Sequence, residues 1–160
     1  MARHTATVCF PSPVGTIDVE ANMLGITRVR LGVRGKSREV GEGRAIENAR
    51  QGRSQILAFL GGDLREFSVA IVFDGTPFQR SVWGELQRVP YGATKTYGEI
   101  ALALGRPRAA RAVGTACGAN PLPLLVPCHR IVGCDGSLVG FGGGIEVKRY
   151  LLAMEKASTA

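Results

Sequence analysis

The residues best suited to chemistry are a cysteine and a histidine that are adjacent, in the segment Pro127-Cys128-His129-Arg130. A thiolate is a strong nucleophile, and an imidazole can take the proton of the thiol. Neighbours in an extended strand point to opposite faces, so cooperation between Cys128 and His129 requires a turn in the chain or a bridging water. The alternative is a buried structural cysteine beside a chance histidine, and the segment alone leaves both interpretations open.

The ordinary acidity of a thiol limits what a lowered pKa could contribute. A cysteine with a pKa of about 8.5 is ~3 % thiolate at pH 7. A lower pKa raises the thiolate fraction but reduces the intrinsic nucleophilicity by a similar factor. We therefore expect positioning and proton removal by His129 to matter more than an extreme resting pKa of Cys128.

A second feature is a pair of short helices expected over residues 97–104 and 108–119, joined by a turn that contains Gly105. This spacing is typical of a helix-turn-helix. The second helix carries one long cation, Arg111, among small residues, which are Ala109, Ala110, Ala112, Gly114 and Ala116. Such a bare surface could come close to a nucleic-acid groove. Close helix packing with Arg111 in solvent is the alternative.

The remaining candidates give weaker signals. Residues 140–144 are rich in glycine but lack the sequence of a phosphate-binding loop, so a flexible loop or a close approach to a ligand is expected. Taken alone, Glu155 is best interpreted as a surface acid. The other cysteines, Cys9, Cys117 and Cys134, form no closely spaced pair and are interpreted as structural. Cys9 has only His4 nearby as a second metal ligand, and two ligands do not make a metal site, so we expect no bound metal. We expect Cys134 to be a secondary target for oxidation.

Composition and charge restrict the classes of partner. The chain has 160 residues and a formal net charge of +7, and the stretch from Arg88 to Arg130 holds six basic residues and one acidic residue. Such a basic stretch indicates a polyanion such as nucleic acid, although a solvated basic face is the alternative. No apolar run approaches the roughly 20 residues that span a bilayer, and residues 1–10 resemble no secretion signal. We therefore expect a cytoplasmic protein that binds no membrane.

The elements that must position these residues fall into two groups. Residues 1–74 predict a small α/β subdomain, with strands within 5–31, a mobile linker over 32–44, a helix over 45–60 and an alternating strand over 67–73. Residues 76–160 predict a mainly helical subdomain. Two of its helices are expected to begin at the capping boxes of Thr76 with Gln79 and Thr96 with Glu99. The fold class is therefore α/β (α+β), with the small subdomain packed on the helical one.

Together these segments resemble the O6-alkylguanine-DNA alkyltransferases, also called methylated-DNA–protein-cysteine methyltransferases. The resemblance covers roughly residues 76–157 and is specific. It is carried by four segments, which are Asn120-Pro121-Leu122-Pro123-Leu124-Leu125-Val126-Pro127-Cys128-His129-Arg130-Ile131-Val132, Arg108-Ala109-Ala110-Arg111-Ala112-Val113-Gly114, Thr96-Tyr97-Gly98-Glu99-Ile100-Ala101 and Leu151-Leu152-Ala153-Met154-Glu155. It implies a ribonuclease H-like N-terminal subdomain over residues 1–74 and a DNA-binding, alkyl-accepting domain over residues 76–160.

The resemblance implies a single-turnover DNA repair reaction. Cys128 would take the alkyl group from O6 of guanine, and from O4 of thymine, irreversibly and without a cofactor. His129 would take the thiol proton through a water, Glu155 would hold the histidine, and Asn120 would support this network. Tyr97 would press on a phosphate and donate to the base.

The resemblance also implies how DNA is held. The helix-turn-helix would enter the minor groove of double-stranded DNA, and Arg111 would fill the gap left by the flipped nucleotide. Further DNA contacts are implied for Tyr97, Gly98, Ala109, Ala110 and Gly114. The base pocket would use the main chain of Cys128, Ile131 and Gly142, with Phe141 stacking on guanine. Phe141 stands where many relatives have tyrosine, so a hydroxyl contact is lost.

Other functions remain as alternatives. A non-catalytic binder of alkyl lesions would lack the acceptor at position 128, which here is cysteine. A cysteine hydrolase gives no reason for the Arg111 helix, and a plain DNA-binding regulator leaves Cys128 without a role. We expect a monomer, and cooperative binding on DNA stays open.

Overall fold

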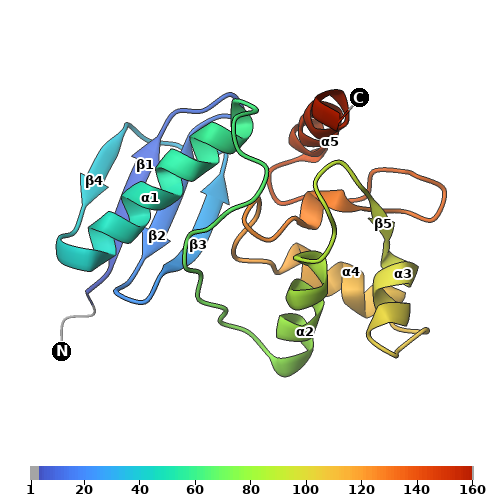
Figure 1. The fold of residues 1–160 in the computed structure, drawn as a ribbon. Coiled ribbons are helices and arrows are strands. Elements are labelled where there is room, and N and C mark those ends of the chain that lie inside the picture. The colour runs from blue at the N-terminus through green and yellow to red at the C-terminus, as the bar shows by residue number, and fades with distance from the viewer. Residues whose placement is uncertain (1–3, 160) are drawn as a thin grey trace. The chain divides into compact units, whose positions relative to one another are not determined.

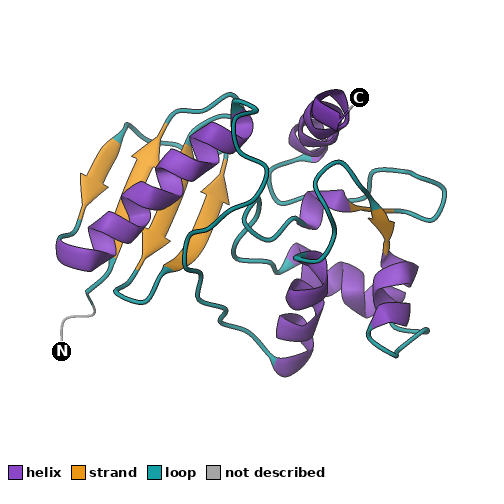
Figure 2. Ribbon diagram, in the orientation of Figure 1, coloured by secondary structure: helices purple, strands orange, loops and turns teal. Residues whose placement is uncertain are grey.

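Two compact units, Met1–Asp74 and Gly75–Ala160, make up the fold of this chain. We describe residues 4–159 in a computed structural model, and each unit is described by itself (Figures 1 and 2). Both strands and helices are present, so the mixed α/β class expected from the sequence is confirmed.

The first unit contains a four-stranded antiparallel sheet. Its strands are β1 (Ala6–Phe10), β2 (Ile17–Ala21), β3 (Ile26–Leu31) and β4 (Arg38–Val40), in the order β3-β2-β1-β4. Val8, Val19 and Val29 lie opposite one another across three strands, and all three are buried. A tight turn joins β1 to β2, in which the N–H of Gly15 donates to the carbonyl of Ser12 and Gly15 takes a left-handed φ of 98°.

One helix, α1 (Gly43–Leu60), lies across a face of this sheet, as Figure 1 shows. Its apolar stripe is buried, as the spacing of residues 45–60 predicted. Gly52 is required for the close approach, because a Cβ there would lie 2.5 Å from Cδ1 of Ile26. The helix ends at Gly61 and Gly62, whose N–H groups donate to the carbonyls of Leu57 and Phe59.

Two sequence predictions in this unit were wrong. The segment expected as a mobile linker contains β4, which pairs with β1, and the first two residues of α1. All three residues of β4 are exposed, so the strand left no apolar pattern to detect. Residues 67–73 form no strand and make only an isolated bridge between Ile71 and Ile26. Their alternation reflects alternate burial of an extended segment and not pairing along its length.

The second unit is mainly helical. Its elements are α2 (Pro77–Leu86), β5 (Lys95–Thr96), α3 (Tyr97–Ala103), α4 (Ala110–Gly118), the 3₁₀ turn η1 (Cys128–Arg130), β6 (Ile131–Val132) and α5 (Ile145–Thr159). Both predicted capping boxes are confirmed, at Thr76 with Gln79 and at Thr96 with Glu99. These caps fix where α2 and α3 begin.

Helices α2, α3 and α4 pack against one another. The indole of Trp83 is buried and donates to the carbonyl of Ala116 at 2.9 Å, which ties α2 to α4. The turn between α3 and α4 extends to Ala109, whose N–H donates to the carbonyl of Arg106, so α4 begins two residues later than expected.

The short parallel pair of β5 and β6 determines where α3 starts. Lys95 lies opposite Ile131 and Thr96 opposite Val132. Because Tyr97 follows β5 and Ile131 follows η1, this pairing brings the first turn of α3 beside the Cys128–Arg130 turn. None of the helices within residues 4–159 has the length and apolar character needed to cross a lipid bilayer.

The first capping box provides a test of the fold. The hydroxyl of Thr76 accepts from the N–H of Gln79 at 3.1 Å. Thr76→Ala removes this acceptor, and we expect the free energy of unfolding to fall by about 1 kcal/mol. Thr76→Ser keeps the acceptor and is the matched control. Urea denaturation of the two variants checks this, and equal stability of the alanine and serine variants would contradict the role of the cap.

Candidate active site

The reactive cysteine and its histidine lie on one tight turn. Residues Cys128–Arg130 form η1, in which the N–H of Arg130 donates to the carbonyl of Pro127 at 3.0 Å. All three side chains are buried, and His129 has no exposed surface. The chain therefore turns here, which was one of the two arrangements that the sequence left open. An extended strand would have placed the thiol and the imidazole on opposite faces.

The segment that leads into this turn is strained and is held by Asn120. Leu124 has a left-handed φ of 74°, which is costly for a residue with a Cβ. Asn120 compensates by donating from Nδ2 to the carbonyl of Val126 and accepting from the N–H of Leu122, both at 2.9 Å. A further hydrogen bond from the Asn120 side chain to Cys128 favours the thiolate. The structure thus brings Asn120 and Cys128 together.

Glu155 connects the turn to helix α5. Its Oε2 lies 2.5 Å from Nε2 of His129, and its Oε1 accepts from Nε of Arg130 at 2.8 Å. Oε1 also accepts from the N–H of Gly92 at 2.9 Å. Glu155 is 1 % exposed, so its interpretation as a surface acid was wrong. A carboxylate buried to this degree is stable only with such partners.

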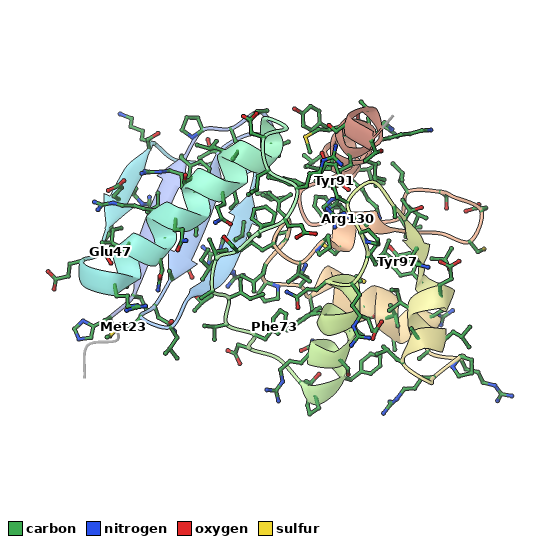
Figure 3. The ribbon with its side chains drawn as sticks, in the orientation of Figure 1. Met23, Glu47, Phe73, Tyr91, Tyr97 and Arg130 are labelled. Carbon is green, nitrogen blue, oxygen red and sulfur yellow. The ribbon has the colours of Figure 1, made fainter. Side chains whose placement is uncertain are left out.

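Arg130 completes the cluster from the other side. Its Nη1 donates to the carbonyl of Val89 at 2.8 Å, and its guanidinium lies over the ring of Tyr91, 5.5 Å from the centroid (Figure 3). Arg130 is therefore committed to the protein interior. Arg130 is thus not available to a polyanion. The other five basic residues of the stretch are exposed, namely Arg88, Lys95, Arg106, Arg108 and Arg111.

The protonation states follow from these contacts. Burial alone would raise the pKa of Glu155, but His129, Arg130 and Gly92 outweigh it and lower the pKa to about 2. Burial lowers the pKa of His129; Glu155 opposes this shift, whereas Arg130 and Lys148 add to it. His129 is thus neutral beside an ionised Glu155. A carboxylate can only accept, so Nε2 carries the proton and Nδ1 is the basic nitrogen.

Cys128 rests as a thiol. Burial raises its pKa, while the hydrogen bond from Asn120 and the charge of Lys148 oppose that shift. A thiol in this state needs a base when it reacts. Neutral His129 on the same turn is such a base, so the geometry favours proton removal on demand over a permanent thiolate.

A cavity of about 810 Å³ opens onto Cys128. Three further segments line it, which are the start of α3, one face of α4 and the glycine-rich loop after β6. Most predicted DNA and base contacts lie on this wall, namely Tyr97, Gly98, Ala110, Arg111, Gly114, Phe141 and Gly142. The remaining predicted residues are not part of the wall, namely Ala109, Asn120, His129, Ile131 and Glu155.

Two side chains at this site were missed by sequence reasoning. Cys117, interpreted as structural, lines the cavity, and burial raises its pKa to about 12. Lys148 was not considered, yet it is fully buried and donates from Nζ to the carbonyls of Ile131 and Val139. Helical spacing could have revealed it, because Lys148, Leu151 and Glu155 share the buried face of α5.

Cys134 also lies on the cavity wall and is exposed, and its oxidation stays a prediction.

No group of three or more His, Cys, Asp or Glu side chains within residues 4–159 is arranged to hold a metal ion.

Comparison with known proteins places this site in a family. The family described as 6-O-methylguanine DNA methyltransferase, DNA binding domain, matches residues 77–157. A methylated-DNA–protein-cysteine methyltransferase of Methanosarcina acetivorans is 40 % identical over 149 residues, covering 91 % of this chain and 95 % of the relative. This chain belongs to the methylated-DNA–protein-cysteine methyltransferase family.

Solved structures of this methyltransferase family agree in fold. The O6-methylguanine methyltransferase of Mycobacterium tuberculosis superimposes with a TM-score of 0.83 at 37 % identity, covering 96 % of this chain and 93 % of that chain. The OGT of the same organism in complex with DNA gives a TM-score of 0.83 at 40 % identity, covering 94 % and 92 % of the two chains. The resemblance noted in the sequence is therefore confirmed.

The Glu155 contacts predict a dependence of stability on pH. Because the folded pKa is about 2 and the ordinary value is 4.5, the stabilisation is complete above pH 4.5 and is lost as the pH falls toward 2. We expect Glu155→Gln to remove this part of the pH dependence. At pH 7 it should lower the free energy of unfolding by about 3 kcal/mol, because Arg130 loses its buried partner.

Glu146→Gln is the matched control, since Glu146 is an exposed acid on the same helix whose side chain is 87 % accessible. Its effect should stay within about 0.5 kcal/mol. Chemical denaturation between pH 7 and pH 2.5 measures both variants. A Glu155→Gln protein with the wild-type slope below pH 4.5 would show that Glu155 is not the group responsible.

Proposed function

We propose that this chain repairs alkylated DNA by transferring the alkyl group from O6 of guanine, or O4 of thymine, to Sγ of its own Cys128. The observation that carries the proposal is the placement of Cys128 on the wall of a cavity, on one turn with a neutral His129 that Glu155 holds. Membership of the methyltransferase family supports the same reaction.

The chemistry is a displacement at the alkyl carbon. His129 takes the proton of the Cys128 thiol, directly or through a water, and the sulfur attacks the carbon in line with the bond to O6. The S–C bond forms as the C–O6 bond breaks, and guanine leaves with the electron pair and is protonated. Tyr97 on the cavity wall can donate a hydrogen bond to the leaving base, because its hydroxyl is protonated at neutral pH and burial raises its pKa further.

The alkyl group then stays on the protein. The product is a thioether, and cleaving its C–S bond would need a nucleophile that displaces a thiolate from carbon. The site holds a base and hydrogen-bond donors, and Cys128 is its only nucleophile placed beside that base among the described residues. One chain therefore repairs one base, and the protein is consumed as a stoichiometric reactant.

DNA must deliver the base outside the duplex. O6 is inaccessible to in-line attack within the stack, so the nucleotide has to be flipped, and a damaged, poorly paired base is the least costly to flip. The exposed face of α4 presents Ala110 and Gly114 around Arg111, beside Ala109. A surface of small residues fits a minor groove closely, and one long side chain among them can enter the gap in the stack.

The cavity wall offers contacts for the flipped base. Phe141 is half-buried there and can stack on a purine, and a Cβ at Gly142 would meet nothing within 4 Å. Ile131 lies outside the wall, and its carbonyl accepts from Lys148, so we leave it out of base recognition. Minor-groove entry, action as a monomer and a cytoplasmic location stay predictions of the sequence.

The acceptor role has a direct test. The protein is mixed with duplex DNA that carries O6-methylguanine, and its intact mass is measured. We expect one added methylene mass per chain, absent in Cys128→Ser and retained in Cys134→Ser, which removes an exposed thiol on the same wall. More than one repaired base per chain, or an adduct that survives in Cys128→Ser, would contradict the proposal.

The role of Arg111 is tested by comparing two substrates. Free O6-benzylguanine needs no flipping, whereas a lesion in duplex DNA does. Arg111→Ala should slow repair in the duplex at least tenfold while changing the reaction with the free base less than twofold. Arg108→Ala, an exposed cation just before α4, is the matched control for general loss of charge. Equal losses on both substrates would argue against insertion into the stack.

A further inference from the structure

Lys148 in the first turns of α5 is a buried cation without a carboxylate partner. It has no exposed surface, and its Nζ donates to the carbonyl of Ile131 at 2.6 Å and to that of Val139 at 2.9 Å. Among residues 4–159, no Asp or Glu lies within ion-pair distance of this ammonium.

A purely structural role does not account for this charge. Removing an ammonium from water costs several kcal/mol, and two neutral carbonyls return only part of it. A methionine of similar length would fill the same volume between Leu151 and the turn without that cost. The groups around the ammonium of Lys148 must therefore account for the presence of a charge at this position.

The two carbonyls belong to segments on either side of the active site. Ile131 follows η1 directly, and Val139 lies in the loop of residues 133–144, where residues 139–142 line the cavity. The part of this loop that lines the cavity is open, since a Cβ at Gly140 or Gly142 would meet nothing within 4 Å. Its other backbone hydrogen bonds are internal, such as that from Gly144 to Phe141, or join its end to α5, where the N–H of Lys148 donates to the carbonyl of Gly144. The Nζ of Lys148 thus ties the cavity wall to the strand after Cys128.

The charge also acts on the reacting groups. The titratable groups that interact electrostatically with Cys128 are Tyr97 from α3, Cys117 from α4 and Lys148 from α5, and His129 shares its turn. Lys148 lowers the pKa of Cys128 against the effect of burial, and it lowers the pKa of His129 as well. Both effects favour a thiolate next to a neutral base.

We propose that Lys148 is a positioning residue for alkyl transfer, which holds the 139–142 wall of the cavity in place and supplies the fixed positive charge beside the thiolate as it forms. The inference rests on the proposed transfer to Cys128. The two roles of Lys148 can be tested separately. Holding the cavity wall requires N–H donors, whereas stabilising the thiolate requires a positive charge.

The test uses single-turnover transfer from duplex DNA carrying O6-methylguanine, measured from pH 5.5 to 9, together with the Kd for the same DNA. Lys148→Met removes donors and charge. We expect its transfer rate at pH 7 to fall at least tenfold, with a Kd within twofold of wild type. Loss of the charge raises the pKa of both Cys128 and His129, so the rising limb of its pH–rate profile should move to higher pH.

Lys148→Arg keeps the charge and is expected to restore the position of the rising limb, even where its longer side chain leaves the rate reduced. Lys156→Met removes an exposed lysine from the same helix and should match wild type in rate and profile. If Lys148→Met does not fold, Lys148→Gln takes its place. Glutamine keeps two N–H donors on its amide nitrogen without the charge, and it must still move the rising limb to higher pH.

The outcomes are distinct. If wild type transfers no alkyl group to Cys128, the proposed function fails first. If wild type is active and the neutral variants keep its pH profile, losing rate only in proportion to the fraction unfolded, Lys148 is structural and the inference is overturned. A shifted profile in the neutral variants, with the wild-type profile in Lys148→Arg, supports it.

Discussion

The site depends on one buried carboxylate. Glu155 from α5 accepts hydrogen bonds from Gly92, His129 and Arg130, which belong to the loop after α2 and to η1. His129 and Arg130 on their own would be buried polar groups in need of a partner, and Glu155 on its own would be a buried charge. Together they satisfy one another, so α5, the loop and the turn can pack only in this arrangement. The last helix is for this reason part of the active site, although its residues do not line the cavity.

The charges around Glu155 also decide whether His129 can act as a base. An ionised carboxylate 2.5 Å away favours the protonated imidazole, and a protonated imidazole could not take a proton from Cys128. Burial, Arg130 and Lys148 work in the opposite direction and lower the pKa of His129. Burial is the main reason that His129 can be held by Glu155 and still be neutral, and the charges of Arg130 and Lys148 add to its effect.

The sequence predicted what short-range chemistry determines. Both capping boxes and the helix over residues 45–60 depend on residues a few positions apart, and all were confirmed. Strand β4 was missed because its residues are all exposed, and residues 67–73 were mistaken for a strand because alternation reports burial and not pairing. A pattern of apolar residues contains no information about which backbone groups are hydrogen-bonded.

Some residues of the site were predicted from the sequence and others were missed, for a related reason. Cys128 and His129 are adjacent, so their chemistry could be read locally, whereas Glu155 lies 26 residues from His129 and looked like a surface acid until a family resemblance paired them. Cys117 gave no local signal of function, and Lys148 gave only its helical spacing with Leu151 and Glu155. Their positions follow only from the packing of α5 and α4 around the turn, and that packing is a property of the folded chain.

The resting state of Cys128 suits a protein that can act only once. A thiolate of low pKa on the surface reacts with oxidants and with any soft electrophile, and each such event would end the life of a single-use acceptor. Here the thiol is 7 % exposed and burial raises its pKa, so little thiolate is present before a substrate is bound. In the proposed reaction, the thiolate is instead generated at the moment of transfer, by the neutral His129 on the same turn. The fold thus protects the nucleophile by the same burial that makes the base necessary.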